Sequence, residues 1–68
     1  MSIAKTVELS SSSPESFEDA VTRGIERASK TIHNIQGAWV NEMKVDVQDN
    51  KVVSFRVNMK VTFVLDDE

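Results

Sequence analysis

The chain has no cysteine, a single proline and only two glycines among its 68 residues. Without cysteine, neither a disulfide framework nor a thiolate metal site can stabilise so short a chain. With so little proline and glycine, most of the chain is expected in helix or strand. No apolar run approaches the ~18 residues needed to span a bilayer, and no signal peptide is visible at Met1. The sequence therefore predicts one cytoplasmic domain over residues 1–68, without a membrane partner.

The sequence also lacks a basic surface and a recognisable group of catalytic residues. The formal net charge is −3, which argues against a nucleic-acid partner because such partners need a basic surface. No nucleophile, base and orienting residue suggest themselves as a set, so we expect no enzymatic activity. No acidic spacing matches a twelve-residue calcium loop, although carboxylates brought together by symmetry could still form a site. The closing Asp-Asp-Glu run is expected to be a solvated tail.

Hydrophobic periodicity predicts the order strand, helix, strand, strand. Residues 3–9 alternate apolar and polar side chains, which is typical of a short strand. Apolar residues then recur at helical spacing over residues 14–34, where Ser13 is expected to cap the helix and Pro14 to occupy its first turn. Residues 52–65 alternate so regularly that the last strand should have one apolar and one polar face.

The second of the three strands is irregular. The parity of its apolar residues changes between Val40 and Val45, so both can face the helix only if a bulge lies around residues 41–44. With the bulge, the single tryptophan, Trp39, lies on the polar face of the sheet beside Arg56. Without the bulge Trp39 would point at the helix, and the bulged arrangement is favoured.

One helix on a three-stranded antiparallel sheet makes a two-layer α+β unit. The last strand would be ~45 Å long at ~3.3 Å per residue, which is longer than the helix that should cover it. Its overhang, expected at Phe63 and Leu65, needs cover from elsewhere. A small core and uncovered strand edges together favour a homo-oligomer.

Two stretches of the chain resemble the dodecin family. SPESFEDAVTRGIERASKTIHNI, from Ser13, resembles the dodecin helix, and VSFRVNMKVTFVLDD, from Val53, resembles the closing strand. The resemblance runs without a gap from about Val7 to Asp67. It implies a strand–helix–strand–strand subunit with a sheet curled around one long helix, and a hollow shell of twelve copies, a homododecamer.

The resemblance also implies where a flavin would bind. The best-known dodecins stack flavins in pairs between tryptophans, and that tryptophan follows the helix by the pattern Asn, aliphatic, any residue, Trp. Here the pattern reads Asn34, Ile35, Gln36, Gly37, so the stacking ring is absent. A glutamine nineteen positions later usually hydrogen-bonds the flavin, and here that place is Arg56. These departures predict altered or lost flavin binding, and they also fit the calcium dodecins.

Trp39 is two positions beyond Gly37 and therefore on the same sheet face, one pleat along. One interpretation is that it fills a subunit contact, stacking on Arg56 or Lys60. The other is that it replaces the family platform for a planar ligand, such as a flavin fragment or the adenine of coenzyme A. The candidate ligand-binding residues are Gly37, Trp39, Arg56, Asn58 and Lys60.

The like charges of Arg56 and Lys60 on one face require an anionic partner. Glu42, near the expected bulge, is the closest acidic residue, and the planar fork of arginine suits a carboxylate. A neighbouring subunit's carboxylate or a bound anion, such as a phosphate group, would serve as well. We expect Arg56 to be buried in the assembled protein and to pair with a carboxylate, with Glu42 as the favoured partner. The function that the sequence favours is a homo-oligomeric small-molecule binding or storage protein; a calcium-binding dodecin and a purely structural assembly are the alternatives.

Overall fold

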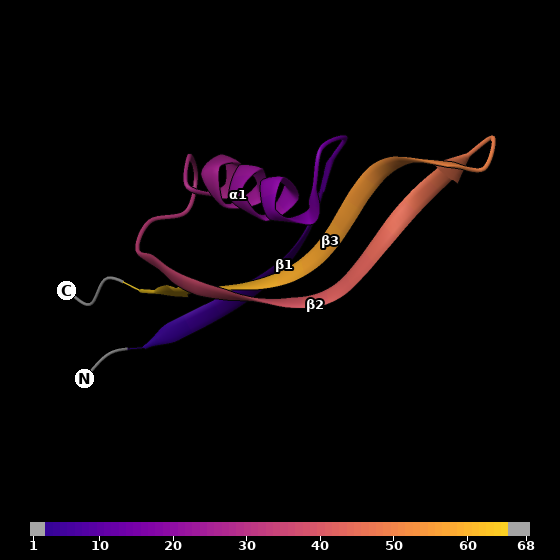
Figure 1. The fold of residues 1–68 in the computed structure, drawn as a ribbon. Coiled ribbons are helices and arrows are strands. Elements are labelled where there is room, and N and C mark those ends of the chain that lie inside the picture. Colours follow the sequence, from indigo (N-terminus) through magenta and orange to yellow (C-terminus); the bar gives the residue numbers. More distant parts are fainter. Residues whose placement is uncertain (1–2, 66–68) are drawn as a thin grey trace.

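The computed structural model describes residues 3–65. Its elements are β1 (Ala4–Ser13), α1 (Phe17–Ala28), β2 (Ile35–Gln48) and β3 (Lys51–Val64), which confirms the predicted order and the α+β class (Figure 1). The predicted acidic tail lies outside the described residues. β1 is longer than the predicted strand over residues 3–9, because its serines continue to pair with β3 as far as Ser13.

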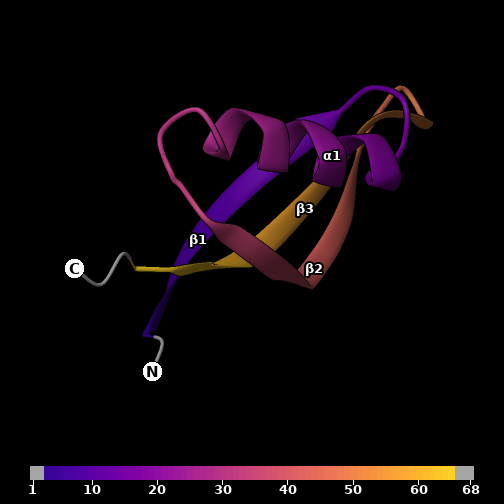
Figure 2. The same ribbon diagram turned by 90° about the vertical axis from the view of Figure 1, so that its left-hand side faces the viewer.

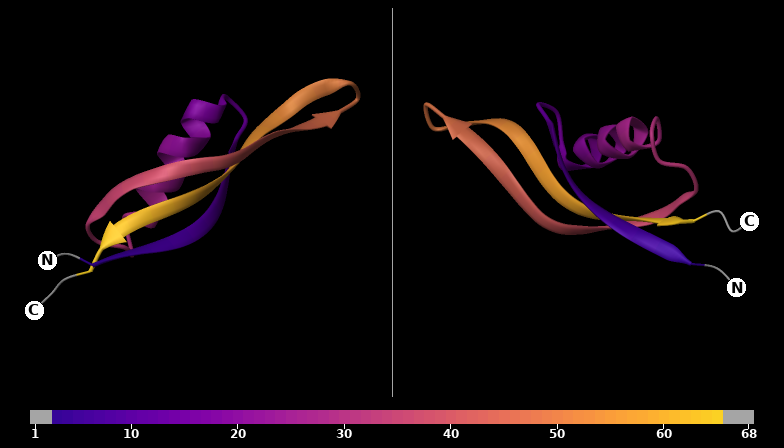
Figure 3. Two further views of the ribbon diagram at one scale, coloured as in Figure 1. Left: turned by 90° about the horizontal axis from the view of Figure 1, so that it is seen from below. Right: turned by 180° about the vertical axis from the view of Figure 1, so that it is seen from behind.

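The sheet is antiparallel throughout, with β3 in the centre and the order β1-β3-β2. α1 lies across one face of the sheet, where it contacts β1 and β3 (Figure 2). The hairpin formed by β2 and β3 continues well past the helix (Figure 3). The described chain is 53 Å long, whereas a helix of twelve residues spans only ~18 Å.

The core lies between α1 and alternate residues of β3. Val57, Met59 and Val61 are fully buried, and Ala20 of the helix packs against them. Helix and sheet approach each other closely at Gly24. A Cβ added there would lie 2.8 Å from Met59 Cε and 3.0 Å from a carbon of the Ser11 side chain.

The helix begins later than the sequence predicted. Ser16, not Ser13, is the N-cap: its hydroxyl accepts a hydrogen bond of 2.9 Å from the backbone N–H of Asp19. Pro14 lies in the turn that precedes the helix, outside its first turn. Several serines before an acidic first turn satisfy the same capping pattern, and the contacts of β1 decide between them.

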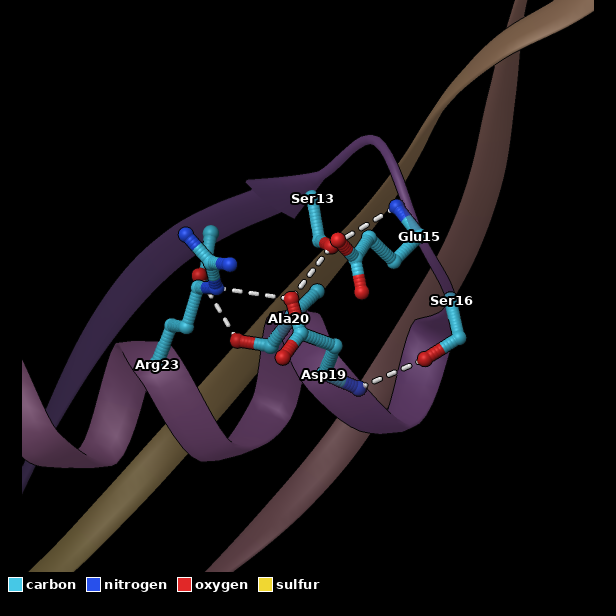
Figure 4. A network of polar contacts seen from close by, with 7 residues as sticks. Ser13, Glu15, Ser16, Asp19, Ala20 and Arg23 are labelled. Atoms are coloured by element: carbon cyan, nitrogen blue, oxygen red, sulfur yellow. Dashed lines mark hydrogen bonds and ion pairs between the residues drawn. The ribbon is translucent and has the colours of Figure 1, made fainter.

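Ser13 instead ties the end of β1 to the helix. Its buried hydroxyl accepts from the Glu15 N–H at 2.9 Å and donates to the Asp19 carboxylate at 2.5 Å (Figure 4). Asp19 also forms an ion pair of 2.7 Å with Arg23, one helical turn further on. The turn between strand and helix is therefore fixed at both ends.

The helix also ends earlier than predicted, at Ala28 rather than near residue 34. The chain turns over residues 29–34 and leaves the turn through Asn34, whose φ of 64° is left-handed. Asparagine tolerates this conformation better than most residues. Ile35 continues the helical apolar spacing in the sequence, but it is used as the first residue of β2, opposite Phe63.

The predicted bulge in β2 is confirmed. The register shifts between Val40 and Glu42, so Asn41 has no direct partner on β3. Two further shifts, at Gln36 and near the hairpin end, were not predicted. The hairpin turn itself has Asp49 and Asn50 at φ of 53° and 62°, which suits a tight two-residue connection.

The bulge leaves an uncovered apolar strip on the helix-side face of β2. Val40, Met43 and Val45 lie opposite Met59, Val57 and Phe55 of β3, but they remain 43%, 59% and 37% exposed because α1 does not cover β2. We call these three residues the β2 strip. The overhang predicted at Phe63 and Leu65 is only part of the bare surface: Phe63 is half-buried, Leu65 is 41% exposed, and the β2 strip adds uncovered apolar surface toward the hairpin.

The close approach at Gly24 gives a first prediction. Gly24→Val should lower the free energy of unfolding by about 1–3 kcal/mol, since the added methyl groups overpack the contact with Met59 and Ser11. The fall in thermal midpoint, followed by circular dichroism at fixed protein concentration, measures it. Gly37→Ala is the matched control, because a Cβ there meets nothing within 4 Å and should cost less than about 0.5 kcal/mol. Equal midpoints for the Gly24 variant and the unmodified protein would contradict the account of the core.

Candidate site on the outer face of the sheet

The outer face is the side of the sheet turned away from α1. β3 presents its polar residues there, in alternation with the buried ones, and each has a direct partner on β2. The pairs along β3 and β2 are Arg56 with Lys44, Asn58 with Glu42, Lys60 with Trp39, and Thr62 with Gly37. The structure thus brings all five predicted ligand-binding candidates onto one face.

Trp39 stands beside a hollow in this face. Its side chain is 67% exposed, although indole is one of the largest apolar groups in proteins. The hollow has a volume of about 340 Å³ and is lined by Gln36, Gly37, Ala38, Trp39 and Thr62. Its open space begins where Gly37 has no side chain.

The ion pair of Arg56 differs from the predicted one. Its guanidinium donates to the Asp46 carboxylate at 3.2 Å, and Lys44 lies 3.8 Å from the other oxygen of the same group. Glu42 instead accepts a hydrogen bond of 2.9 Å from the side-chain amide of Asn58. The predicted Glu42–Arg56 pair is therefore wrong for the chain by itself.

The bulge at Asn41 explains the change of partner. It places Glu42 opposite Asn58 and Asp46 opposite Ser54, diagonally across from Arg56. After the bulge, Glu42, Lys44 and Asp46 occupy alternate positions and therefore lie on the same face. This alternation in the sequence could have identified Asp46 as a second acidic neighbour of Arg56. Arg56 is 46% exposed in the single chain, so its burial by a neighbouring subunit stays a prediction.

Lys60 has no comparable partner. Its cross-strand neighbours are Trp39 on β2 and Glu8 on β1. Ion pairs between residues 3 and 65 involve Asp19 with Arg23 and Asp46 with Lys44 and Arg56, and none involves Lys60. Lys60 is therefore a direct cross-strand neighbour of the exposed Trp39 and forms no ion pair with another residue between 3 and 65.

Other parts of the described chain are weaker candidates for a binding site. Within residues 3–65 no three histidine, cysteine, aspartate or glutamate side chains gather closely enough to hold a metal ion. A larger groove of about 560 Å³ runs between β1 and α1, with Arg23 and Arg27 among its lining residues. It borders the free edge of β1, where another strand or subunit would also bind. Over the same residues no helix is both long and apolar enough to cross a membrane.

A helix across a three-stranded antiparallel sheet, with a long hairpin and an exposed polar face, defines the subunit architecture of a known class of small proteins. The dodecin family model matches residues 3–66, and the chain belongs to the dodecin family.

Individual relatives agree with this assignment. The Mycobacterium tuberculosis protein named calcium dodecin is 29% identical over 63 residues, which cover 93% of this chain and 89% of the relative. The dodecin from Streptomyces davaonensis has a similar structure, with a TM-score of 0.93, 33% identity and 97% of each chain covered. An arginine-to-alanine variant of the Thermus thermophilus dodecin matches with a TM-score of 0.94, 28% identity and 100% of both chains covered.

The revised ion pair gives a second prediction. Arg56→Ala and Asp46→Asn should show a coupling of ~0.2–1 kcal/mol in a double-mutant cycle, because the pair is partly exposed and screened by solvent. Glu42→Gln combined with Arg56→Ala should be additive and serves as the control. Thermal melts of the singles and doubles measure both cycles. Coupling of Arg56 to Glu42 but not to Asp46 would restore the original pairing and contradict the register described above.

Proposed function

We propose that this dodecin is a homo-oligomeric, non-catalytic protein that binds or stores small planar molecules on the outer face at Trp39. The observation that carries the proposal is an exposed indole beside a hollow that a glycine leaves open. Ligand sites are typically concave and largely apolar with a few polar groups, and Thr62 and Gln36 supply such groups here. Indole offers a flat face on which aromatic rings stack.

Flavin binding in the manner of the tryptophan-bearing dodecins is not supported at Gly37, which has no ring. Trp39 lies one pleat further along the same face, so a ring stacked on it would be displaced toward Lys60. The proposed site therefore differs in position from the flavin site that the resemblance implies. We expect it to bind isoalloxazine or adenine rings with altered geometry and reduced affinity.

Assembly into a dodecamer is part of the proposal. The β2 strip exposes three large apolar side chains side by side on a strand that the helix does not cover. Clustered apolar surface of this kind usually marks a contact with another chain. A second copy of the chain is the partner that family membership favours.

Calcium binding is the second candidate function, favoured by the relative that is named calcium dodecin. Calcium requires six to eight oxygen ligands, more than any cluster in residues 3–65 supplies. A calcium site would therefore need carboxylates from several subunits, for which the outer face offers Glu42 and Asp46. Calorimetric titration of the chelator-treated assembly with calcium should then release heat at sub-millimolar concentrations, and a flat titration would remove this candidate.

Replacement of Trp39 tests the platform directly. Trp39→Leu should weaken riboflavin binding by roughly 5- to 150-fold, since stacking on an aromatic side chain is worth ~1–3 kcal/mol and ~1.4 kcal/mol is one decade. Flavin fluorescence measures binding, and light scattering measures assembly in the same samples. Lost assembly with unchanged riboflavin affinity would show that Trp39 fills a subunit contact and would sink the binding proposal.

Restoring a ring at the family position gives the converse prediction. Gly37→Trp should raise riboflavin affinity by roughly 5- to 150-fold, because the open space at Gly37 can accept a side chain and the new indole adds a stacking surface. Gly37→Leu, which adds bulk without a ring, is the matched control and should not raise it. If the unmodified protein already binds riboflavin as tightly as Gly37→Trp, Trp39 alone performs the full stacking role.

The β2 strip gives the prediction for assembly. Met43→Lys should dissociate the oligomer, because it places a charge in apolar surface that another subunit is expected to cover. The adjacent substitution Lys44→Gln lies on the outer face and should leave the oligomer intact. Light scattering of both variants and the unmodified protein decides the matter. A monomeric unmodified protein, or an intact Met43→Lys oligomer, would contradict the assigned interface.

A further inference from the structure

We infer that the hollow beside Trp39 selects flat aromatic molecules that carry a negative charge, and that Lys60 provides the selection. This inference rests on the proposed function and names its ligand class. Two features of the outer face carry it: the shape of the hollow, and the distribution of ion pairs around it.

The hollow suits the ring of such a molecule. Gly37 leaves its part of β2 without a side chain, and Trp39 is among the residues that line the hollow. A volume of about 340 Å³ is near the lower end of the range for small-molecule sites, so the hollow accommodates a ring system and leaves a substituent outside. That substituent has to run along the outer face.

Lys60 is the charge that such a substituent meets first. It lies directly opposite Trp39, and side chains in that relation have Cβ atoms ~4.5–5.5 Å apart. The pair next to it is Thr62 with Gly37, which borders the hollow. The flexible four-carbon stem of lysine allows its ammonium group to reach a substituent above either pair.

The other cations in the middle of the outer face, Arg56 and Lys44, are already engaged. Arg56 and Lys44 share the carboxylate of Asp46, whereas Lys60 forms no ion pair within residues 3–65. Lys60, opposite the Trp39 ring and without an ion pair within residues 3–65, is complementary to an aromatic anion, such as an aromatic phosphate or carboxylate. A neutral ring would use the indole and leave Lys60 without a partner.

Glu8 modulates this selection. It is the partner of Lys60 on β1, on the side away from Trp39. Although the two side chains form no ion pair in the described chain, the carboxylate lowers the local positive potential. Removing that charge should therefore strengthen the binding of an anion and leave a neutral ligand unaffected.

Riboflavin and FMN test the inference, because they share one ring system and differ by a phosphate. At low ionic strength FMN should bind the assembled protein about fivefold more tightly than riboflavin, with the difference shrinking at high salt as exposed charges are screened. Lys60→Gln should abolish the difference by weakening the binding of FMN more than that of riboflavin. Glu8→Gln should widen it, and Lys44→Gln, the matched control, should leave it unchanged. Light scattering confirms that each variant remains assembled.

The outcomes separate the two proposals. Equal affinities for riboflavin and FMN in the unmodified protein, or a preference for FMN that survives Lys60→Gln, would overturn the inference and leave the proposed function standing. If neither flavin binds the unmodified protein, the proposed function fails, and the inference fails with it. A salt-sensitive preference that disappears only in Lys60→Gln supports both.

Discussion

The alternation of side chains along β3 is the constraint on which the rest of the structure depends. Val57, Met59 and Val61 are buried beneath α1, and the residues between and beside them point to the outer face. β3 is the central strand, so both neighbouring strands take their register from it. A slip of one residue would exchange the two faces and place charged side chains in the core. The burial that stabilises the subunit therefore also fixes which side chains are available for binding.

The unpaired Asn41 gives β2 its two surfaces. Trp39 and Glu42 are three positions apart and would lie on opposite faces of a regular strand, but the bulge brings both to the outer face. The same bulge puts Val40 and Met43 together on the helix-side face, where they form most of the β2 strip. One extra residue thus separates the surface proposed for ligands from the surface proposed for assembly.

The element order, the faces of β3 and the bulge could all be predicted from the sequence, because each follows from the spacing of apolar residues. The length of the helix could not, since Ile32 and Ile35 continue the helical spacing after the helix itself has ended at Ala28. Several serines before the helix fit the same capping pattern, so its first residue was also ambiguous. The partnership of Arg56 with Asp46 required counting through the bulge from its far side. Burial of Arg56 depends on a neighbouring subunit, whose position a single sequence does not encode.

The position of Trp39 is the centre of this account, and its fluorescence tests it most directly. The chain has one tryptophan and no tyrosine, so intrinsic emission above 300 nm reports on Trp39 alone. Titration of the assembled protein with FMN should quench this emission in proportion to the ligand bound, because the ring stacks on the indole. FMN binding that leaves the tryptophan emission unchanged would place the ligand elsewhere and contradict the account.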